Sequence, residues 1–345
     1  MKTLRDVRDL AAAALIAPED AAGLEQVAAR YAVAITPAMA ALIAPGDARD
    51  PIALQFVPSL AELDRKPGEL ADPIGDHAHS PVEGVVHRYP DRVLLKLLHV
   101  CPVYCRFCFR REMVGPGEDA VLAPAKVEAA LAYIAAHAAI WEVILTGGDP
   151  LMLSPRRLAE IMGALAAMPH VKIIRLHSRV PAVDPARITR EMVAALRVPG
   201  AATYLALHAN HPRELNPAAR AACARLIDAG IPILGQTVLL RGVNNDIETL
   251  AALMRAFVET RIKPYYLHHP DLAPGTAHFR LGIAEGQALM RALQGSVSGL
   301  CQPAYMLDIP GGHGKVPLGP GYVEAADGHL ALTDFAGQRH LYPPR

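Results

Sequence analysis

The sequence has few aromatic residues and no excess of charge. Phe, Trp and Tyr make up 5% of the chain, tryptophan occurs once, and 34 Lys and Arg balance 34 Asp and Glu. Basic surfaces with interleaved aromatic side chains are typical of proteins that bind nucleic acid. No apolar run approaches the 18 residues or so that a membrane span needs. We therefore expect neither nucleic acid nor membrane as a partner.

Cysteine is also scarce, and its placement excludes a disulfide framework. The chain has five cysteines among 345 residues, an odd number, and three of them lie in one short stretch. The first 20 residues superficially resemble a signal peptide, but Asp6 and Asp9 interrupt the basic part, so an amphipathic helix is the better interpretation. These features predict a cytoplasmic protein.

What the sequence does contain is a repeated strand–helix pattern. Hydrophobic residues make up 52% of the chain, enough for a large core. Short β-branched runs, each followed by a helical pattern, predict strands over 92–100, 141–148, 171–179, 202–210, 231–240 and 263–269. Six such units indicate an α/β fold with a parallel sheet curled into a partial, TIM-like (β/α)6 barrel. A doubly wound open sheet is the alternative.

This pattern also suggests how the chain is divided. We expect an N-terminal helical region over residues 1–75, a core barrel over 76–303 and a C-terminal segment over 304–345. In parallel barrels the chemistry takes place at the C-terminal ends of the strands. The loop after the first predicted strand is therefore a candidate site.

That loop lies within "LLHVCPVYCRFCFRRE" (97–112) and contains Cys101, Cys105 and Cys108. Three thiolates spaced C-x3-C-x2-C can ligate three irons of a 4Fe–4S cluster and leave the fourth iron open for chemistry. Zinc is the competing interpretation, but structural zinc needs four ligands, and His99 is too close to Cys101 along the chain to be the fourth. Three unrelated buried cysteines are the remaining alternative.

The cysteine spacing resembles that of the radical S-adenosylmethionine superfamily. The resemblance implies that the open iron binds S-adenosylmethionine and that an electron from the cluster cleaves it to a 5′-deoxyadenosyl radical. "LTGGDPL" (145–151) resembles the superfamily's glycine-rich segment, so Gly147, Gly148 and Asp149 are candidate cofactor residues. A tight strand-to-helix turn is the alternative role of the two glycines.

A second cofactor is suggested near the C-terminus. Lys315 lies in a glycine-rich turn after an apolar run, and a desolvated lysine can form a Schiff base with a carbonyl cofactor. Arg88, Tyr89 and Arg92 precede the first strand, and the two arginines could hold a phosphate ester. A surface lysine and solvated arginines are the alternatives.

Eight motifs between residues 75 and 323 together resemble, in the same order, the lysine 2,3-aminomutase family. They are "HRYPDRV", "CPVYCRFCFRR", "LTGGDPL", "HSRVP", "ANHPREL", "QTVLLRGVNN", "PYYLHHPDLAPGTAHFR" and "DIPGGHGKVPL". The resemblance implies a radical S-adenosylmethionine enzyme that also carries pyridoxal phosphate, with Lys315 as the cofactor lysine and Arg88, Tyr89 and Arg92 at its phosphate. His208 and Gln236 fall in motifs that face the cofactors.

The resemblance also implies a substrate. Arg110 matches the position that pairs with the substrate carboxylate, and Asp271 and Asp308 match the pair that holds the ε-ammonium of lysine. Two carboxylates around one buried ammonium are reasonable, because an unpaired buried charge is costly. A turn residue and a strand-end cap are the alternative roles of the two aspartates. The implied enzyme is an isomerase that converts L-lysine to β-lysine and needs a cellular reductant.

The chain departs from the family pattern in one respect. Full-length aminomutases carry a C-terminal extension whose clustered cysteines bind zinc, whereas Cys223 and Cys301 are isolated here and are expected in the core. This leaves open both a zinc site and the homo-oligomer that it supports. The short length is closer to the branch that makes β-lysine for elongation factor P, which is one alternative function. A non-catalytic iron–sulfur protein is the other.

Overall fold

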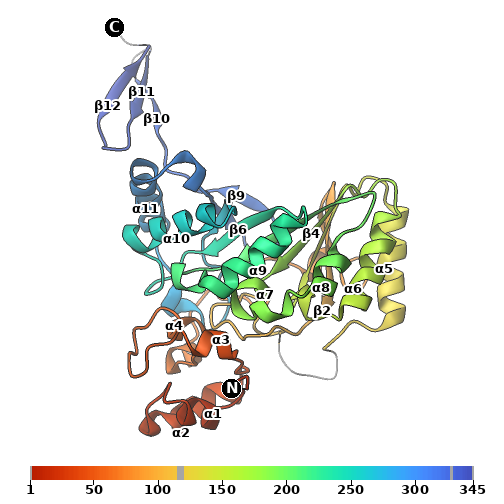
Figure 1. Ribbon diagram of the computed structural model, residues 1–345. Coiled ribbons are helices and arrows are strands. Elements are labelled where there is room, and N and C mark those ends of the chain that lie inside the picture. Colours follow the sequence, from red (N-terminus) through yellow and green to blue (C-terminus); the bar gives the residue numbers. More distant parts are fainter. Residues whose placement is uncertain (1, 115–119, 327–328, 344–345) are drawn as a thin grey trace.

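The computed structural model describes residues 2–114, 120–326 and 329–343. Its main body is one large curled sheet covered by helices, and a small separate sheet projects from this body at the C-terminal end (Figure 1).

The large sheet has nine strands whose spatial order equals their order in the chain. Seven of them run parallel: β2 (Arg92–Leu98), β3 (Glu142–Gly147), β4 (Ile173–Ser178), β5 (Ala202–His208), β6 (Ile233–Val238), β7 (Lys263–His268) and β8 (Ala304–Asp308). Strand β1 (Val85–Tyr89) pairs antiparallel with β2, and β9 (Lys315–Pro317) pairs antiparallel with β8. Right-handed crossovers that all run in one direction along the sheet place every helix on the same face of the sheet. The sheet therefore curls around its other face.

The helices of the barrel follow the predicted pattern. They are α5 (Pro124–Ala136), α6 (Pro155–Ala166), α7 (Val180–Val183), α8 (Arg190–Leu196), α9 (Pro217–Asp228), α10 (Ile247–Glu259) and α11 (Ile283–Ser296). The side chain of Ser154 caps α6 by accepting a hydrogen bond from the Arg157 N–H at 3.3 Å, and Pro155 takes the first helical position. In the described ranges, no helix is long and apolar enough to cross a membrane.

These observations confirm the α/β partial barrel and each of the six predicted strands. The doubly wound alternative is wrong, since the strand order never reverses. The seventh parallel strand, β8, forms from the apolar run before the Lys315 turn and ends at Asp308, as the sequence indicated, whereas the two antiparallel strands at the edges were not predicted. Arg88 and Tyr89 belong to β1, and Arg92 begins β2, so these residues lie on a hairpin and not on a segment that precedes the sheet.

The N-terminal helices are short: α1 (Val7–Ala12), α2 (Ala21–Ala28), α3 (Pro37–Ala40) and α4 (Ala53–Phe56). Buried residues of this region, such as Leu10 and Phe56, belong to the same hydrophobic cluster as Leu95 of the barrel. Cys223 and Cys301 are buried in that cluster too, as the sequence predicted. The division into three parts at residues 75/76 and 303/304 stays a prediction.

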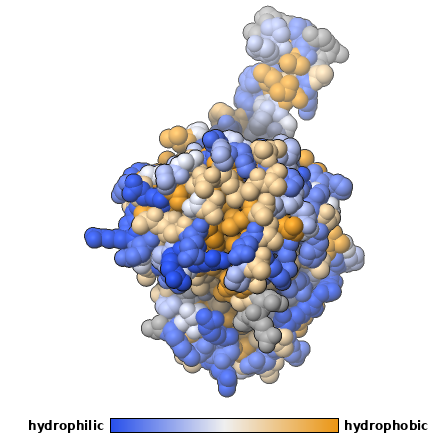
Figure 2. Space-filling view, turned by 90° about the vertical axis from the view of Figure 1, so that its right-hand side faces the viewer, coloured by the Kyte–Doolittle hydropathy of each residue, from blue (hydrophilic) through white to orange (hydrophobic). Residues whose placement is uncertain are grey.

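The C-terminal sheet was not expected. Strands β10 (Val323–Ala326), β11 (His329–Thr333) and β12 (Arg339–Tyr342) form an antiparallel meander. Figure 2 shows it as a lobe that stands apart from the body and carries apolar side chains. Phe335 and Val323 are 63% and 58% exposed, respectively.

Candidate active site

The inner face of the curled sheet is polar toward the C-terminal ends of the strands. Residues paired across parallel strands point to the same face. The register pairs His208 of β5 with Gln236 of β6, and His268 of β7 with Val238 of β6. The same face includes Lys96 of β2 and His177 of β4, which the register pairs with Thr146 and Ala206. If these polar side chains were surrounded only by hydrophobic residues, they would lack hydrogen-bond partners, which is costly. This face of the sheet therefore lines a polar site.

The cysteine loop begins at the end of β2. Cys101, Cys105 and Cys108 are partly accessible, and none of the three forms a disulfide. Burial raises the pKa of each thiol, and charges of neighbouring thiols also raise the pKa of Cys101 and that of Cys108, which reaches about 11. Thiolates bind iron, so a cationic cluster shared by the three cysteines would offset this electrostatic cost. No three His, Cys, Asp or Glu side chains within the described ranges lie close enough to hold a single metal ion.

A buried arginine contacts this loop. Arg179, which follows β4, donates from Nη1 to the Cys105 Sγ at 2.9 Å and from Nη2 to Glu214 at 2.7 Å. Gln55 of the N-terminal region also accepts a hydrogen bond from Nη2. Arg179 lies in the motif "HSRVP", but no feature of the sequence singles this residue out.

Gly147 and Gly148 allow the end of β3 to approach the start of the cysteine loop. Gly147 has φ +105°, and a Cβ there would lie 2.5 Å from the carbonyl oxygen of Leu98. A Cβ on Gly148 would overlap the backbone of Val100. The structure therefore supports the turn role of these glycines, and their contact with S-adenosylmethionine stays a prediction.

Asp149 joins the ends of β3 and β4. Its buried carboxylate accepts hydrogen bonds from the Ser178 hydroxyl at 2.8 Å and from the backbone N–H of Arg179 at 2.7 Å. Burial raises its pKa. Asp149 thus fixes the backbone of the arginine that touches Cys105.

The second group of predicted residues meets at Lys315. The Nζ of Lys315 pairs with Asp308, the last residue of β8. The backbone N–H of Lys315 donates to the Tyr89 hydroxyl at 2.8 Å, and the Arg92 guanidinium lies 3.8 Å from the centre of the Tyr89 ring. Arg88 Nη1 lies 3.8 Å from Asp308 Oδ1. The structure therefore brings Lys315 together with all three residues expected at the phosphate.

Asp271 follows β7 and lies close to the same group. Burial and the charge of Asp308 together raise its pKa to about 7, although the charges of Lys315 and Arg110 oppose this shift. The negative charges of the two aspartates that are predicted to hold an ammonium thus repel each other. Asp308 already pairs with a primary ammonium, that of Lys315.

Buried polar atoms around Lys315 fit a polar cofactor. Within the described residues, Arg88 Nε, His177 Nε2 and His268 Nε2 are buried without a hydrogen-bond partner. Burial lowers the pKa of both histidines, that of His268 to about 3, so both imidazoles are neutral at pH 7. Such orphaned groups would be satisfied by the polar substituents of pyridoxal phosphate. Sequence analysis missed both histidines, although alternation along β4 and β7 places them inside the barrel.

His208 lies next to the cysteine loop, and Gln236 is its partner on the neighbouring strand β6. His208 Nε2 is 3.1 Å from Asn210 Oδ1, and its ring is 5.6 Å from the ring of Phe107 in that loop. Burial lowers its pKa to about 3. The positions fit a cofactor that bridges the cluster and the barrel, and the individual roles stay predictions.

Arg110 is held by a residue that the sequence did not reveal. Its Nε and Nη2 donate to Asp76 Oδ2 at 3.1 and 2.9 Å. Asp76 has no exposed surface and also lies 3.4 Å from Arg88 Nη2 and 3.7 Å from Lys96 Nζ. These cations lower the pKa of Asp76 against the effect of burial.

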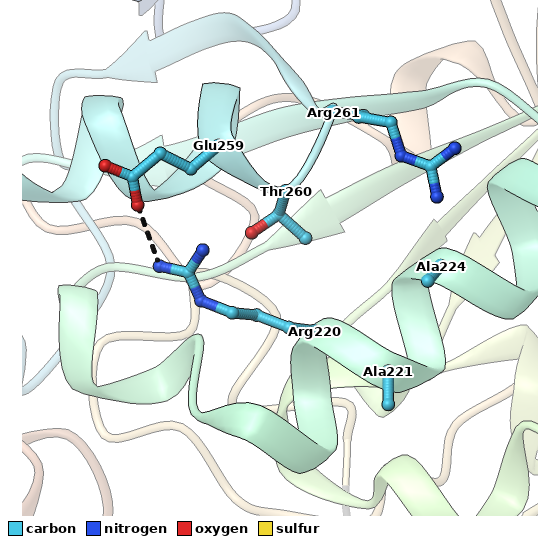
Figure 3. Close-up of a pocket in the computed structure, with 6 residues that line it drawn as sticks. All are labelled: Arg220, Ala221, Ala224, Glu259, Thr260 and Arg261. Atoms are coloured by element: carbon cyan, nitrogen blue, oxygen red, sulfur yellow. Dashed lines mark hydrogen bonds and ion pairs between the residues drawn. The ribbon is translucent and has the colours of Figure 1, made fainter.

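A hollow on the outer surface is unrelated to these residues. Figure 3 shows it between α9 and the end of α10, where Arg220 and Glu259 pair at 3.2 Å. Its lining residues are Arg220, Ala221, Ala224, Glu259, Thr260 and Arg261. It contains none of the predicted site residues, so the chemistry belongs to the barrel interior.

Comparisons with known proteins show the family to which the chain belongs. Residues 95–254 match the model of the radical SAM superfamily. The chain is 39% identical to the L-lysine 2,3-aminomutase of Fusobacterium nucleatum over 97% of its own length and 78% of that protein. It is 34% identical to the glutamate 2,3-aminomutase of Clostridioides difficile over 97% of its own length and 79% of that protein.

Among solved structures, a radical SAM methyltransferase from Sphaerobacter thermophilus matches with a TM-score of 0.45 and 18% identity, over 65% of this chain and 68% of that one. The chain covers more than two thirds of the length of both aminomutases. The chain therefore belongs to the lysine 2,3-aminomutase family, and it is a radical S-adenosylmethionine isomerase that uses a 4Fe–4S cluster, S-adenosylmethionine and pyridoxal phosphate.

Proposed function

We propose that this enzyme converts L-lysine to β-lysine by moving the amino group from the α-carbon to the β-carbon. The observation that carries the proposal is the juxtaposition of Asp271, Asp308 and Lys315. Two carboxylates beside one ammonium form a receptor for a cationic side chain. Since relatives named for lysine and for glutamate match similar shares of the chain, these side chains are the better guide to the substrate.

The proposal assigns residues to the cofactors. Cys101, Cys105 and Cys108 would hold the cluster, with Gly147, Gly148, Asp149, His208 and Gln236 on the side of S-adenosylmethionine and the barrel. Lys315 would hold pyridoxal phosphate, with Arg88, Tyr89 and Arg92 at its phosphate. When bound, these groups supply the homolytic removal of a β-hydrogen that is not acidic and the temporary attachment of the migrating nitrogen.

The residues of the chain then bind and orient the substrate. Arg110 would pair with the substrate carboxylate at one end, and Asp271 and Asp308 would hold the ε-ammonium at the other. The pairing of Asp308 with the ammonium of Lys315 supports this role, because it shows that Asp308 can bind a primary ammonium. The neutral His177 and His268 add hydrogen-bonding capacity without adding charge.

Charge also excludes the nearest competitor. A glutamate side chain would place a third carboxylate against Asp271 and Asp308, which is repulsive in a site sheltered from water. The test is anaerobic incubation of the reconstituted enzyme with S-adenosylmethionine, pyridoxal phosphate, a reductant and one of lysine, ornithine or glutamate. β-Lysine is the expected product. Glutamate turned over as well as lysine would contradict the assignment of both aspartates.

We further propose that the enzyme works in the cytoplasm with a cellular electron donor. Unpaired, partly accessible cysteines suit a reducing compartment, and the cluster must receive one electron for each cleavage of S-adenosylmethionine. Sedimentation of the loaded enzyme would show whether the chain also forms a homo-oligomer.

A further inference from the structure

Residues 72–80, which we call the bridging segment, connect two parts of the proposed site. The carboxylate of Asp72 fixes the segment by accepting hydrogen bonds from the backbone N–H groups of Asp76 at 2.9 Å and His77 at 2.8 Å. Asp76 points inward, with no exposed surface. The segment ends in the short 3-10 helix His77–His79, just before β1.

One side of the bridging segment packs against the turn that carries Lys315. A Cβ on Gly75 would lie 2.5 Å from the backbone nitrogen of Gly312, so the two backbones are in direct contact. The Nε2 of His79 lies 3.1 Å from the Gly312 carbonyl oxygen. The position of the Lys315 turn is therefore tied to the position of this segment.

The other side holds Arg110. A guanidinium has two edges that can each bind a carboxylate through two N–H groups. Asp76 Oδ2 accepts from Nε and Nη2, which form the side edge. Within the part of the chain that the structure describes, no hydrogen bond from Nη1 is found. The end edge of the guanidinium is thus left for another carboxylate.

We propose that Asp76 is a positioning residue that aims the free edge of Arg110 at the substrate carboxylate, at a distance from Lys315 that the bridging segment sets. The positioning role of Asp76 rests on the proposed function, in which Arg110 binds the substrate carboxylate. Holding the arginine before substrate arrives removes part of the ordering cost of binding. No residue at this position was singled out from the sequence.

A purely structural role for Asp76 makes a different prediction. Asp76 also lies near Arg88 and Lys96, so it could serve only to balance their charge. Charge balance requires a carboxylate but no particular reach. Positioning requires that reach, because a longer side chain would displace Arg110. Asp76→Glu therefore separates the two roles, and Asp76→Asn tests the carboxylate itself.

The experiment measures binding and not turnover. Enzyme loaded with pyridoxal phosphate, without S-adenosylmethionine, is titrated with lysine and with lysinamide, and binding is followed through the absorption spectrum of the cofactor. The ratio of the two dissociation constants reports how strongly the substrate carboxylate is recognised. The lower amine pKa of the amide affects every variant alike and cancels between them. Glu83→Gln is the matched control, because Glu83 is an exposed carboxylate close in sequence to the bridging segment.

We expect the wild type and Glu83→Gln to prefer lysine strongly, and Asp76→Asn to reduce that preference about tenfold. Asp76→Glu should fold, as judged by its thermal unfolding, and should also lose several-fold of the preference. A wild-type ratio in Asp76→Glu would overturn the positioning role, as would equal weakening of lysine and lysinamide in Asp76→Asn. If the wild type itself does not distinguish the two ligands, the assignment of Arg110 in the proposed function fails instead.

Discussion

Asp271 is half-buried beside another carboxylate, and both features favour its protonated form. To bind an ammonium, however, Asp271 must be ionised. Its pKa of about 7 in the folded chain exceeds its ordinary value of 3.8. The folded state therefore holds this proton more tightly than the unfolded state, and stability is lost as pH rises from about 4 through 7. Binding of a substrate ammonium would reverse the effect by favouring the charged carboxylate.

We predict that Asp271→Asn stabilises the substrate-free protein while abolishing lysine turnover. At pH 8 the gain in free energy of unfolding should be on the order of 2 kcal/mol, a discounted value because the side chain is only partly buried. At pH 4, where Asp271 is protonated, the gain should nearly vanish. Urea unfolding of the variant and the wild type at the two pH values measures this difference in the free energy of unfolding. A variant that is less stable than the wild type at pH 8 would show that Asp271 does not carry this electrostatic cost.

Asp308 should matter to the substrate but not to radical formation. Asp308→Asn removes a charge-assisted hydrogen bond to the ε-ammonium, so kcat/KM for lysine should fall by about 1.5–3 kcal/mol in transition-state stabilisation. Cleavage of S-adenosylmethionine by the reduced cluster does not involve that end of the substrate and should persist. Steady-state kinetics and 5′-deoxyadenosine release measure the two effects separately. Equal loss of both would place Asp308 near the cluster and contradict its assignment.

Sequence analysis found the residues whose chemistry is local, and missed those whose role depends on distant contacts. The three cysteines lie in one loop with diagnostic spacing, and Lys315 lies in a glycine-rich turn. Asp76 acts on Arg110, 34 positions away, and Arg179 acts on Cys105, 74 positions away. No pattern in either neighbourhood predicts such a pairing. Buried neutral histidines such as His177 are likewise defined by what surrounds them.

At the scale of elements, the cysteine loop depends on the N-terminal region. Glu62 is fully buried. Its carboxylate accepts hydrogen bonds from Nε and Nη2 of Arg106, with Nε 2.9 Å from Oε1, and it also pairs with Arg111. Glu62 lies in the 3-10 helix Leu60–Leu63, which Ser59 caps. Two arginines of the cysteine loop thus share a single counter-charge, a carboxylate that comes from outside the barrel.

We predict that Glu62→Gln destabilises the protein by about 3–5 kcal/mol, because it leaves two guanidinium groups buried without their counter-charge. Glu285→Gln, which breaks the exposed pair with Arg241, should cost no more than about 1 kcal/mol. Chemical unfolding curves compare the two variants. Similar small costs for both would mean that water reaches the Glu62 cluster.

The pattern of parallel strands was predictable because each strand is buried on the face that the helices cover and is followed by a helix, so that the strand–helix unit repeats along the sequence. Strand β9 has three residues, and the strands of the C-terminal sheet have four or five residues without regular alternation of polar and apolar side chains, so neither stands out from a loop. The sequence predicted that the N-terminal region is helical, and its helices are only four to eight residues long. Proline and glycine interrupt that region, and its short helices are stabilised by packing on the barrel and not by their own length.

For the whole molecule, the two ends of the chain should differ in importance. The N-terminal region shares its hydrophobic cluster with the barrel and supplies Glu62 and Gln55 to buried ionic networks. The C-terminal sheet keeps Phe335, Val323 and Tyr342 largely exposed. Loss of buried apolar surface and of a buried counter-charge destabilises a protein, whereas loss of exposed residues does not.

We therefore predict opposite results from two truncations. A chain that ends after Tyr322 should keep a cooperative thermal transition within a few degrees of the full-length value, since about 1 kcal/mol corresponds to roughly 2–4 °C at larger domain sizes. It should also still bind pyridoxal phosphate at Lys315. A chain that begins at residue 76 should lack a cooperative transition, because the barrel core and Arg106 with Arg111 would be exposed or unpaired. Calorimetry of both decides the matter: a cooperative barrel without residues 1–75 would show that this region is an independent domain, as the predicted boundary at residues 75/76 would allow.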